Sequence, residues 1–262
     1  MAISPVKEAA LRLGVAIHQP ERVRRPEIVE QLRAIAPEAM VVVGYGQIIP
    51  QSIIDIAPLG IINVHASLLP KYRGAAPIQW AIARGESITG VTTMRINAGL
   101  DTGDMLLKWE TPISDQETAI QLGERLAPAG ADLLVRTLAE LRMITPEPQD
   151  DAQATLAPIL KKEDGHIDWS MSARQILNRI RGFQPWPGCY GFRNGKRLHF
   201  WKAAIADRAL LPGELRVDAR RLFAGCGDVS IELLEVQAEG KNRMPAAAYL
   251  NGNTIEAGET LQ

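Results

Sequence analysis

Two short apolar segments, with a helix-like segment before the first, constrain the fold of this chain more than any other feature. The segments are Met40-Val41-Val42-Val43 and Ile61-Ile62-Asn63-Val64, and Pro26 to Ile35 reads as a helix with proline in its first turn. Strands of continuous apolar character are typical of parallel sheets, because helices cover both faces of such a sheet. We therefore predict an α/β domain with a doubly wound, mostly parallel sheet.

The rest of the first half continues this alternation of helices and strands. Pro77 to Arg84 has a helical pattern, Gly90 to Ile96 alternates like a strand, and Met105 to Glu110 is a candidate neighbouring strand. A long amphipathic helix from about Glu117 to Leu141 then completes the domain.

A change in composition separates this domain from a second one. Residues 145 to 158 read TPEPQDDAQATLAP, which is rich in proline and acidic residues and has no periodicity, as expected of a linker. The 262 residues of the chain also exceed the usual size of one domain, about 100 to 200 residues. We predict an N-terminal domain over residues 1–144, a linker over 145–160 and a C-terminal domain over 161–262.

The second domain shows one helix followed by short strands. Ser172 is a candidate N-cap for a helix over Ala173 to Arg181, and Asn194-Gly195 between two strand-like runs is a strong hairpin signal. This rhythm predicts a small β-barrel of the OB-like type. The further short strand patterns are Gly213 to Val217, Arg221 to Ala224 and Val229 to Val236.

Composition excludes several classes of protein. No apolar run approaches the roughly 20 residues of a membrane span, and the start MAISPVKEAA lacks the apolar core of a signal peptide. The two cysteines, Cys189 and Cys226, form no CxxC or Cys/His cluster, which argues against a disulfide framework or a zinc site. We expect a cytoplasmic protein with two structural thiols, no metal and no membrane contact.

Basic residues are concentrated in the second domain. The 38 residues from Trp169 to Ala206 contain seven Lys or Arg side chains and no carboxylate. Such an excess of positive charge attracts a polyanion, and cations beside aromatic rings suit contact with RNA. We interpret Trp186, Phe200 and Trp201 as core residues of the barrel, and we predict RNA contact by the cations. The predicted RNA-binding cations are Arg174, Arg181, Arg193, Lys196, Arg197 and Lys202.

The strongest candidate for chemistry lies at the end of the second apolar strand. Asn63 and His65 are two residues apart, so they point to the same side of a strand, at the place where open α/β sheets bind ligands. Thirty-six residues after His65, the loop Gly99-Leu100-Asp101-Thr102-Gly103 contains two glycines that permit a tight turn. Such a loop could hold the Asp101 carboxylate over the imidazole.

Each of these residues alone also has a structural interpretation. A single histidine at a strand end is more often a satisfied structural residue, and an aspartate in a glycine-rich loop is usually a turn former. The loop from Ala66 to Gly74, however, mixes apolar side chains with backbone donors and is suited to line a flat heteroaromatic pocket. The spacing as a whole therefore favours a site.

The spacing also resembles that of a known family. Asn63-Val64-His65 is followed by Ser-Leu-Leu-Pro, Arg-Gly-Ala-Ala-Pro-Ile, Gly-Val-Thr and Leu-Asp-Thr-Gly-Asp-Met, and a weaker echo occurs at Pro185-Trp186-Pro187-Gly188. Together these motifs resemble the folate-dependent formyltransferases, and among them those that act on methionyl-tRNA. The resemblance implies a Rossmann-like catalytic domain and an OB-like tRNA-binding domain in a monomer.

The resemblance also implies an activity and roles for residues. The activity is formyl transfer from 10-formyltetrahydrofolate to the α-amino group of methionine on initiator methionyl-tRNA, which supports translation initiation. Asn63 and a protonated His65 donate to the oxyanion that develops, and Asp101 keeps His65 charged and passes the proton of the amine onward. The folate-binding residues carried over are Ser67, Leu68, Leu69 and Pro70, with Tyr45 and Gly46 as a further wall.

Two alternatives stay open at this point. Sugar-nucleotide formyltransferases share Asn-x-His and Ser-Leu-Leu-Pro, although they tend to read Arg-Ala-Pro and Ala-Asp-Ala-Gly where this chain has Ala75-Ala76-Pro77 and Leu100-Asp101-Thr102-Gly103. The other alternative is an inactive RNA-binding remnant. Domains of the family begin with further strands before the segment that resembles Ser4-Pro5-Val6-Lys7. We therefore expect N-terminal strands to be missing here, and a sheet without them to fold poorly.

Overall fold

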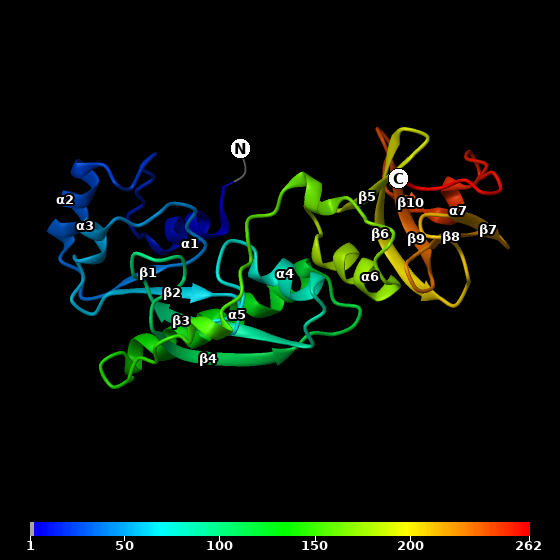
Figure 1. Ribbon diagram of the computed structural model, residues 1–262. Coiled ribbons are helices and arrows are strands. Elements are labelled where there is room, and N and C mark those ends of the chain that lie inside the picture. The colour runs from blue at the N-terminus through cyan, green and yellow to red at the C-terminus, as the bar shows by residue number, and fades with distance from the viewer. Residues whose placement is uncertain (1–2) are drawn as a thin grey trace.

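The computed structural model describes residues 3–262, which form two β-sheets toward opposite ends of the molecule (Figure 1). The first sheet has the strand order β1-β2-β3-β4. β1 and β2 are parallel, whereas β2 pairs antiparallel with β3, and β3 antiparallel with β4. The bounds are Met40–Val42 for β1, Ile61–His65 for β2, Ile88–Arg95 for β3 and Met105–Pro112 for β4.

The pair β1–β2 has the parallel arrangement that the two apolar runs predict. Met40 lies opposite Ile61 and Val42 opposite Asn63, so both strands end at the same edge of the sheet. Parallel strands need a crossover connection, and here the crossover contains the short helix α3 (Gln51–Ile54). In the described part of this sheet the parallel arrangement is confined to β1 and β2, because β3 and β4 extend it as antiparallel strands.

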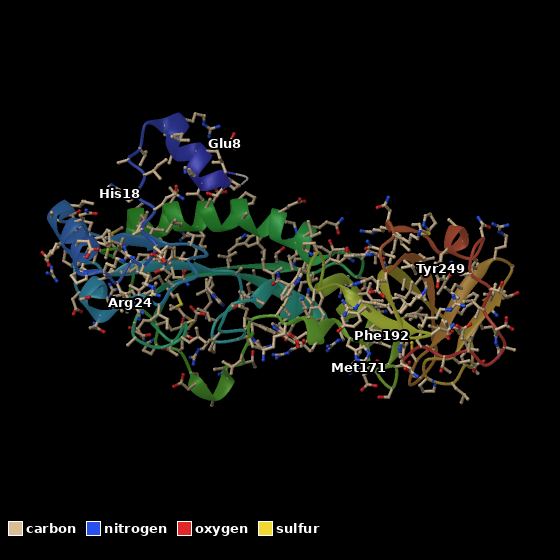
Figure 2. The ribbon with its side chains drawn as sticks, turned by 90° about the horizontal axis from the view of Figure 1, so that it is seen from above. Glu8, His18, Arg24, Met171, Phe192 and Tyr249 are labelled. Atoms are coloured by element: carbon tan, nitrogen blue, oxygen red, sulfur yellow. The ribbon has the colours of Figure 1, made fainter. Side chains whose placement is uncertain are left out.

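Helices cover both faces of the first sheet. The bounds of the other helices in this half are Pro5–Leu13 for α1, Pro26–Ile35 for α2, Pro77–Ala83 for α4 and Ala119–Glu140 for α5. α2 and α3 pack with Ile61 of β2 in one apolar cluster, and α5 packs with Val64 in another. α1 buries none of its side chains and lies apart from α5 in Figure 2. No helix within residues 3–262 is long and apolar enough to cross a membrane.

The second sheet is antiparallel, with the order β5-β6-β9-β8-β7 and β10 beside β9. The predicted turn Asn194-Gly195 joins β5 to β6, and both residues have positive φ (50° and 73°), as a type I′ hairpin requires. α6 begins after Ser172, as predicted, and Ser172 forms a capping box with Gln175. The bounds are Cys189–Arg193 for β5, Lys196–Ala206 for β6, Leu215–Asp218 for β7, Arg221–Gly225 for β8, Ser230–Ala238 for β9, Met244–Pro245 for β10, Ala173–Gly182 for α6 and Ala246–Tyr249 for α7; two 3₁₀ turns, η1 (Asp151–Gln153) and η2 (Lys162–Gly165), precede them.

The C-terminal residues join the two edges of this second sheet. Phe192 of β5 exchanges two main-chain hydrogen bonds with Gln262, and the N–H of Leu215 in β7 donates to the carbonyl of Glu259 at 2.8 Å. Between these contacts the Leu261 side chain is 5% exposed and belongs to the core under the sheet. The C-terminal segment thereby connects the two edge strands, closes the sheet into a barrel and pairs backbone groups of both edges.

The segment predicted as a linker is hydrogen bonded to the first half of the molecule. Glu147 exchanges two main-chain hydrogen bonds with Met105. The main chain of Arg73 bonds to that of Thr155 and Ala157. These contacts use backbone groups, so they leave no periodic pattern in the sequence.

Helices α4 and α6 join the two halves of the molecule. Gly182 at the end of α6 approaches α4 so closely that a Cβ atom there would lie 2.9 Å from the backbone nitrogen of Ala83. Trp80 and Phe183 pack edge to face, with ring centroids 5.2 Å apart. Ala76 and Ala83 belong to the same apolar core as the second sheet, so the two halves share a continuous contact.

We expect Leu261→Ala to lower the free energy of unfolding by about 2 to 4 kcal/mol, because it leaves a cavity in a packed core. The control Leu211→Ala removes the same atoms from a side chain that is 73% exposed. Its effect should stay within about 0.5 kcal/mol. Urea unfolding followed by circular dichroism measures both changes. Equal effects would show that the C-terminal segment does not close the barrel.

Candidate active site

Strand β2 positions two of the three candidate catalytic residues. Successive residues of a strand point to opposite faces, so Asn63 and His65 share one face, while Val64 packs toward α5 on the other. Asn63 is half-buried, and its side-chain amide has no hydrogen-bond partner within residues 3–262. The amide is therefore available to a ligand near the carboxyl end of β2.

The imidazole of His65 lies between two oxygen atoms. Its Nε2 is 2.9 Å from the main-chain carbonyl oxygen of Tyr72, and its Nδ1 is 3.7 Å from Oδ2 of Asp101. A carbonyl oxygen only accepts hydrogen bonds, so Nε2 carries a proton and donates it to Tyr72. Because His65 is only 5% exposed, this contact fixes the ring and directs Nδ1 toward Asp101. At 3.7 Å the contact between Nδ1 and Oδ2 is longer than a hydrogen bond, so Nδ1 has no hydrogen-bond partner within residues 3–262.

The loop after β3 places Asp101 against this ring. Asp101 has a φ of 51°, in the left-handed region that non-glycine residues rarely adopt, and its Oδ2 accepts the N–H of Gly74 at 2.8 Å. Gly103 lets the loop return close to β3, since a Cβ atom there would lie 1.8 Å from the carbonyl oxygen of Arg95. The structure thus brings together the imidazole at the end of β2 and the carboxylate of the loop after β3.

The loop after His65 divides the predicted folate-binding residues into two groups. The side chains of Ser67 and Leu69 are buried, and the Ser67 hydroxyl donates to the carbonyl of Lys71 at 2.6 Å. Ser67 and Leu69 are 0% and 1% exposed as whole residues, backbone included, so they support the loop from beneath. Of the other predicted folate-binding residues, Leu68 and Pro70 are half-buried, and Tyr45 and Gly46 are exposed.

Thr92 of β3 holds this loop in place. Its hydroxyl donates to the carbonyl of Ser67 at 2.7 Å and accepts the N–H of Leu69 at 3.1 Å. A threonine in a strand is ordinary, because strands favour β-branched residues, so no signal in the sequence points to this role. The role follows from the position of Thr92 on β3, beside the loop.

Tyr72 fixes the far end of the same loop. Its φ of 64° turns the main chain so that the carbonyl faces His65, and its phenol donates to Oε1 of Glu86 at 2.8 Å. Burial, and then the neighbouring Glu86 carboxylate, raise the pKa of Tyr72 above its ordinary value. The phenol therefore stays protonated and remains a donor at neutral pH.

Two of the cations predicted to contact RNA are engaged inside the protein. Arg193 pairs with Glu259 at 2.6 Å in a nearly buried ion pair, and its hydrogen bond lowers the pKa of that carboxyl. Arg181 donates to the carbonyls of Ser114 and Glu117 in the first half of the molecule. These donors are not free for phosphate, which corrects the prediction for Arg181 and Arg193. The sequence count missed their partners because the partners lie more than 60 residues away along the chain.

The other four predicted cations lie at the surface or near it. Lys196 and Lys202 on β6 are exposed and have no ion-pair partner within residues 3–262. Arg174 is exposed and within 3.8 Å of a single carboxylate. The guanidinium of Arg197 stacks over the ring of Tyr190, 4.4 Å from its centroid.

The outer face of β5 and β6 carries a row of three neighbouring rings near these cations, of which His199 and Trp201 are stacked. The ring centroids of Tyr190 and His199 are 5.5 Å apart, and those of His199 and Trp201 are 6.0 Å apart. The interpretation of three aromatic residues as barrel core is right for Phe200, which is fully buried. It is wrong for Trp186, which is 50% exposed, and for Trp201, which is half-buried on the outer face.

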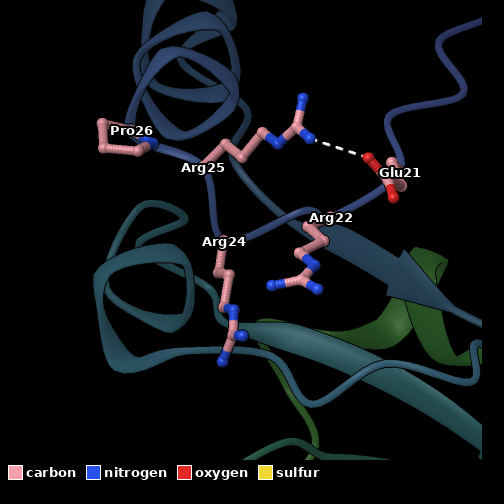
Figure 3. A pocket seen from close by; sticks show the side chains of 5 residues that line it. All are labelled: Glu21, Arg22, Arg24, Arg25 and Pro26. Carbon is pink, nitrogen blue, oxygen red and sulfur yellow. Dashed lines mark hydrogen bonds and ion pairs between the residues drawn. The ribbon is translucent and has the colours of Figure 1, made fainter.

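A hollow before α2 contains none of the candidate residues (Figure 3). In Figure 3 the side chains of Arg22 and Arg24 point to the same side of the chain, whereas Arg25 turns away and pairs with Glu21 at 2.8 Å. The hollow is therefore distinct from the site around His65. Its lining residues are Glu21, Arg22, Arg24, Arg25 and Pro26.

Two family models match the chain. The model described as "Formyl transferase" matches residues 3–138, and the model described as "Formyl transferase, C-terminal domain" matches residues 159–254. The chain belongs to the formyl transferase family. Together with the two sheets, this confirms the predicted fold class of a Rossmann-like domain followed by a β domain.

This formyl transferase has relatives of high identity. The methionyl-tRNA formyltransferase of Solibacter usitatus is 61% identical over 99% of this chain and 85% of that protein. The methionyl-tRNA formyltransferase of Koribacter versatilis is 58% identical over 100% of this chain and 85% of that protein. Among solved structures, the sugar 3N-formyl transferase WlaRD has a TM-score of 0.65 at 20% identity, over 90% of this chain and 81% of that chain, which is a likeness of fold.

Both thiols of this formyl transferase lie outside the candidate site. Cys189 and Cys226 belong to the core of the second sheet. Burial raises the pKa of each thiol to about 12. A buried thiol that stays protonated is neither a nucleophile nor a metal ligand at neutral pH.

We expect a thiol-specific reagent to leave the native protein unlabelled at about pH 8, because only the accessible thiolate reacts. After unfolding in denaturant, both cysteines should be labelled, and mass spectrometry counts the labels. Rapid labelling of either cysteine in the native protein would contradict this placement of the thiols.

Proposed function

We propose that this chain transfers a formyl group from 10-formyltetrahydrofolate to the α-amino group of methionine on initiator methionyl-tRNA. The observation that carries the proposal is the pairing of His65 with Asp101, beside Asn63, in a member of the formyl transferase family. Relatives named methionyl-tRNA formyltransferase, 61% and 58% identical, support the choice of acceptor. In this role the protein supports translation initiation.

The proposed reaction moves a formyl group between two nitrogen atoms. The methionine amine attacks the formyl carbon, the carbonyl oxygen gains negative charge, and the bond between the formyl carbon and N10 of the folate breaks. The amine loses a proton and N10 gains one, so the reaction balances without an oxidant or a reductant. The protein must stabilise the charge on the oxygen and move the proton.

Asn63 and His65 are the proposed donors to that oxygen. The N–H groups of the Asn63 amide have no partner within residues 3–262. In His65, Nε2 donates to Tyr72, so Nδ1 is the ring nitrogen that would donate to the oxyanion. Asp101, 3.7 Å from Nδ1, stabilises the charged ring and accepts the proton of the amine, directly or through water. Both donors act on a charge that grows toward the transition state, which is the condition for raising the rate.

The proposed folate site lies along the loop after His65. Leu68 and Pro70 offer apolar surface, and the buried Ser67 and Leu69 hold the loop that presents this surface, through their hydrogen bonds to Lys71 and Thr92. Apolar walls with a few fixed polar groups are what a flat heteroaromatic ligand requires. Tyr45 and Gly46, exposed on the loop after β1, form a further wall. The solved structure of WlaRD was determined in the presence of dTdp and 5-N-Formyl-THF, which supports a folate of this type here.

We propose a division of labour along the chain. Residues 1–144 carry the catalytic site, 145–160 link the two parts, and 161–262 bind the tRNA. Because its acceptor is a charged tRNA, we place the protein in the cytoplasm, and we propose that it acts as a monomer. The proposed RNA contacts are Arg174, Lys196, Arg197 and Lys202; Arg181 and Arg193 are left out because their donors are used within the protein.

A sugar nucleotide is not favoured as the acceptor. The relatives of high identity are named for methionyl-tRNA, whereas the solved sugar transferase shares 20% identity with this chain. The exposed lysines on β6 give the second half a surface suited to a polyanion.

We expect His65→Ala to fold like the unchanged protein and to lower kcat by a factor of about 10² to 10³ or more, because it removes a donor to the oxyanion. Formation of formyl-methionyl-tRNA, measured under saturating substrates, tests this. The control is His18→Ala, which removes an exposed imidazole from the segment before α2. Near-normal turnover of His65→Ala would overturn the assignment of the site.

We expect the double change Lys196→Gln and Lys202→Gln to weaken tRNA binding mainly at low salt. Each lost phosphate contact should reduce the slope of log affinity against log salt concentration by about 1. Filter binding over a series of salt concentrations measures the slope. Lys108→Gln is the control, since Lys108 is an exposed lysine on β4 of the first sheet. An unchanged slope in the double variant would place the RNA elsewhere.

A further inference from the structure

We propose that Gln149, in the segment between the two sheets, is a positioning residue that holds Asp101 against His65. The inference rests on the proposed function and adds a residue that acts through Asp101 without touching the substrates. Its basis is a set of hydrogen bonds that ties the Asp101 loop to this segment.

The side-chain amide of Gln149 donates hydrogen bonds to two residues of the Asp101 loop. Its Nε2 donates to the carbonyl of Asp101 at 2.8 Å and to the carbonyl of Gly103 at 2.7 Å. Both amide hydrogens are therefore used on the three-residue turn that carries the candidate carboxylate. A carboxamide is the only uncharged side chain with two donors on one nitrogen and an acceptor beside it.

The acceptor side of the same amide is also engaged. Oε1 of Gln149 accepts the Nε–H of Arg73 at 2.9 Å, and the same guanidinium pairs with Asp151 at 2.8 Å. Arg73 is only 7% exposed, so these bonds orient a nearly buried charge. The orientation of Gln149 is thus fixed from one side by Arg73 and from the other by the Asp101 loop.

The conformation that Gln149 holds would not persist without support. Asp101 has a φ of 51°, which an aspartate adopts only where its surroundings impose it. From this conformation its carboxylate reaches both the N–H of Gly74 and Nδ1 of His65. A loop that relaxes toward ordinary backbone angles moves the carboxylate away from the ring.

The segment around Gln149 is itself anchored to both loops of the site. Glu147 exchanges main-chain hydrogen bonds with Met105, just after the Asp101 loop. Thr155 accepts the N–H of Tyr72 on its hydroxyl at 2.9 Å, at the residue whose carbonyl holds His65. Gln149 therefore lies in a segment that is hydrogen bonded both to the loop after β2 and to the start of β4, next to the Asp101 loop.

The test uses two changes at Gln149 and the same two at a neighbour. Gln149→Glu keeps the shape and the contact with Arg73 but has no donors, whereas Gln149→Leu removes both. Gln153→Glu and Gln153→Leu are the controls, because Gln153 lies in the same segment, is exposed and bonds only to Asp150. We expect kcat for formyl transfer to fall about 10- to 100-fold in both Gln149 variants, with KM for each substrate within about twofold.

Two further readouts separate positioning from a merely structural effect. In an Asp101→Ala background, Gln149→Leu should cost no additional activity, because a positioning residue has nothing left to position. Amide hydrogen exchange of the Gly74 N–H, which donates to Asp101, should become faster in both Gln149 variants and stay unchanged in the Gln153 variants.

The outcomes distinguish this inference from the proposed function. If the unchanged protein transfers no formyl group but Gly74 exchanges faster in the Gln149 variants, the proposed function fails and the positioning stands. If kcat and Gly74 exchange are unchanged in the Gln149 variants, the positioning role is wrong. An equal loss of activity with and without Asp101 would likewise overturn it and assign Gln149 to general stability.

Discussion

The candidate site depends on the position of the His65 imidazole. The ring donates a hydrogen bond to the Tyr72 carbonyl and faces the Asp101 carboxylate on its other side. The two oxygens come from different loops, one after β2 and one after β3, so the ring has both partners only when both loops are in place. A buried polar group that loses its partner costs about 1 to 3 kcal/mol. The loops, the strand that ends at His65 and the helices that cover that strand therefore form one connected arrangement.

The same arrangement extends into the second half of the molecule. The segment that carries Gln149 and Thr155 runs on to Pro158, whose carbonyl accepts the Trp80 indole N–H at 2.8 Å. Trp80 belongs to α4, which packs against α6 beneath the second sheet. The loops of the candidate site and the proposed tRNA-binding surface are thus linked by packed side chains and hydrogen bonds, as suits an enzyme that must align a large acceptor with a small donor.

Much of the architecture is predictable because it follows from local patterns. The apolar run that ends in Asn63, the cap at Ser172 and the turn at Asn194 each state a local preference that the structure keeps. Contacts between distant segments leave no such trace. Arg193 pairs with Glu259, 66 residues further along the chain, so the local excess of positive charge around Arg193 gives no sign of this ion pair. Gln149 lies in a segment without periodicity because its contacts are polar and involve single residues.

The activity proposed for this site is the transfer of a formyl group onto the amine of a charged tRNA. The most direct measurement supplies the protein with 10-formyltetrahydrofolate carrying a labelled formyl group, together with methionyl-tRNA, uncharged tRNA or a dTDP-linked amino sugar. We predict label on methionyl-tRNA alone, at the α-amino nitrogen of methionine. Label on the amino sugar with none on methionyl-tRNA would contradict it.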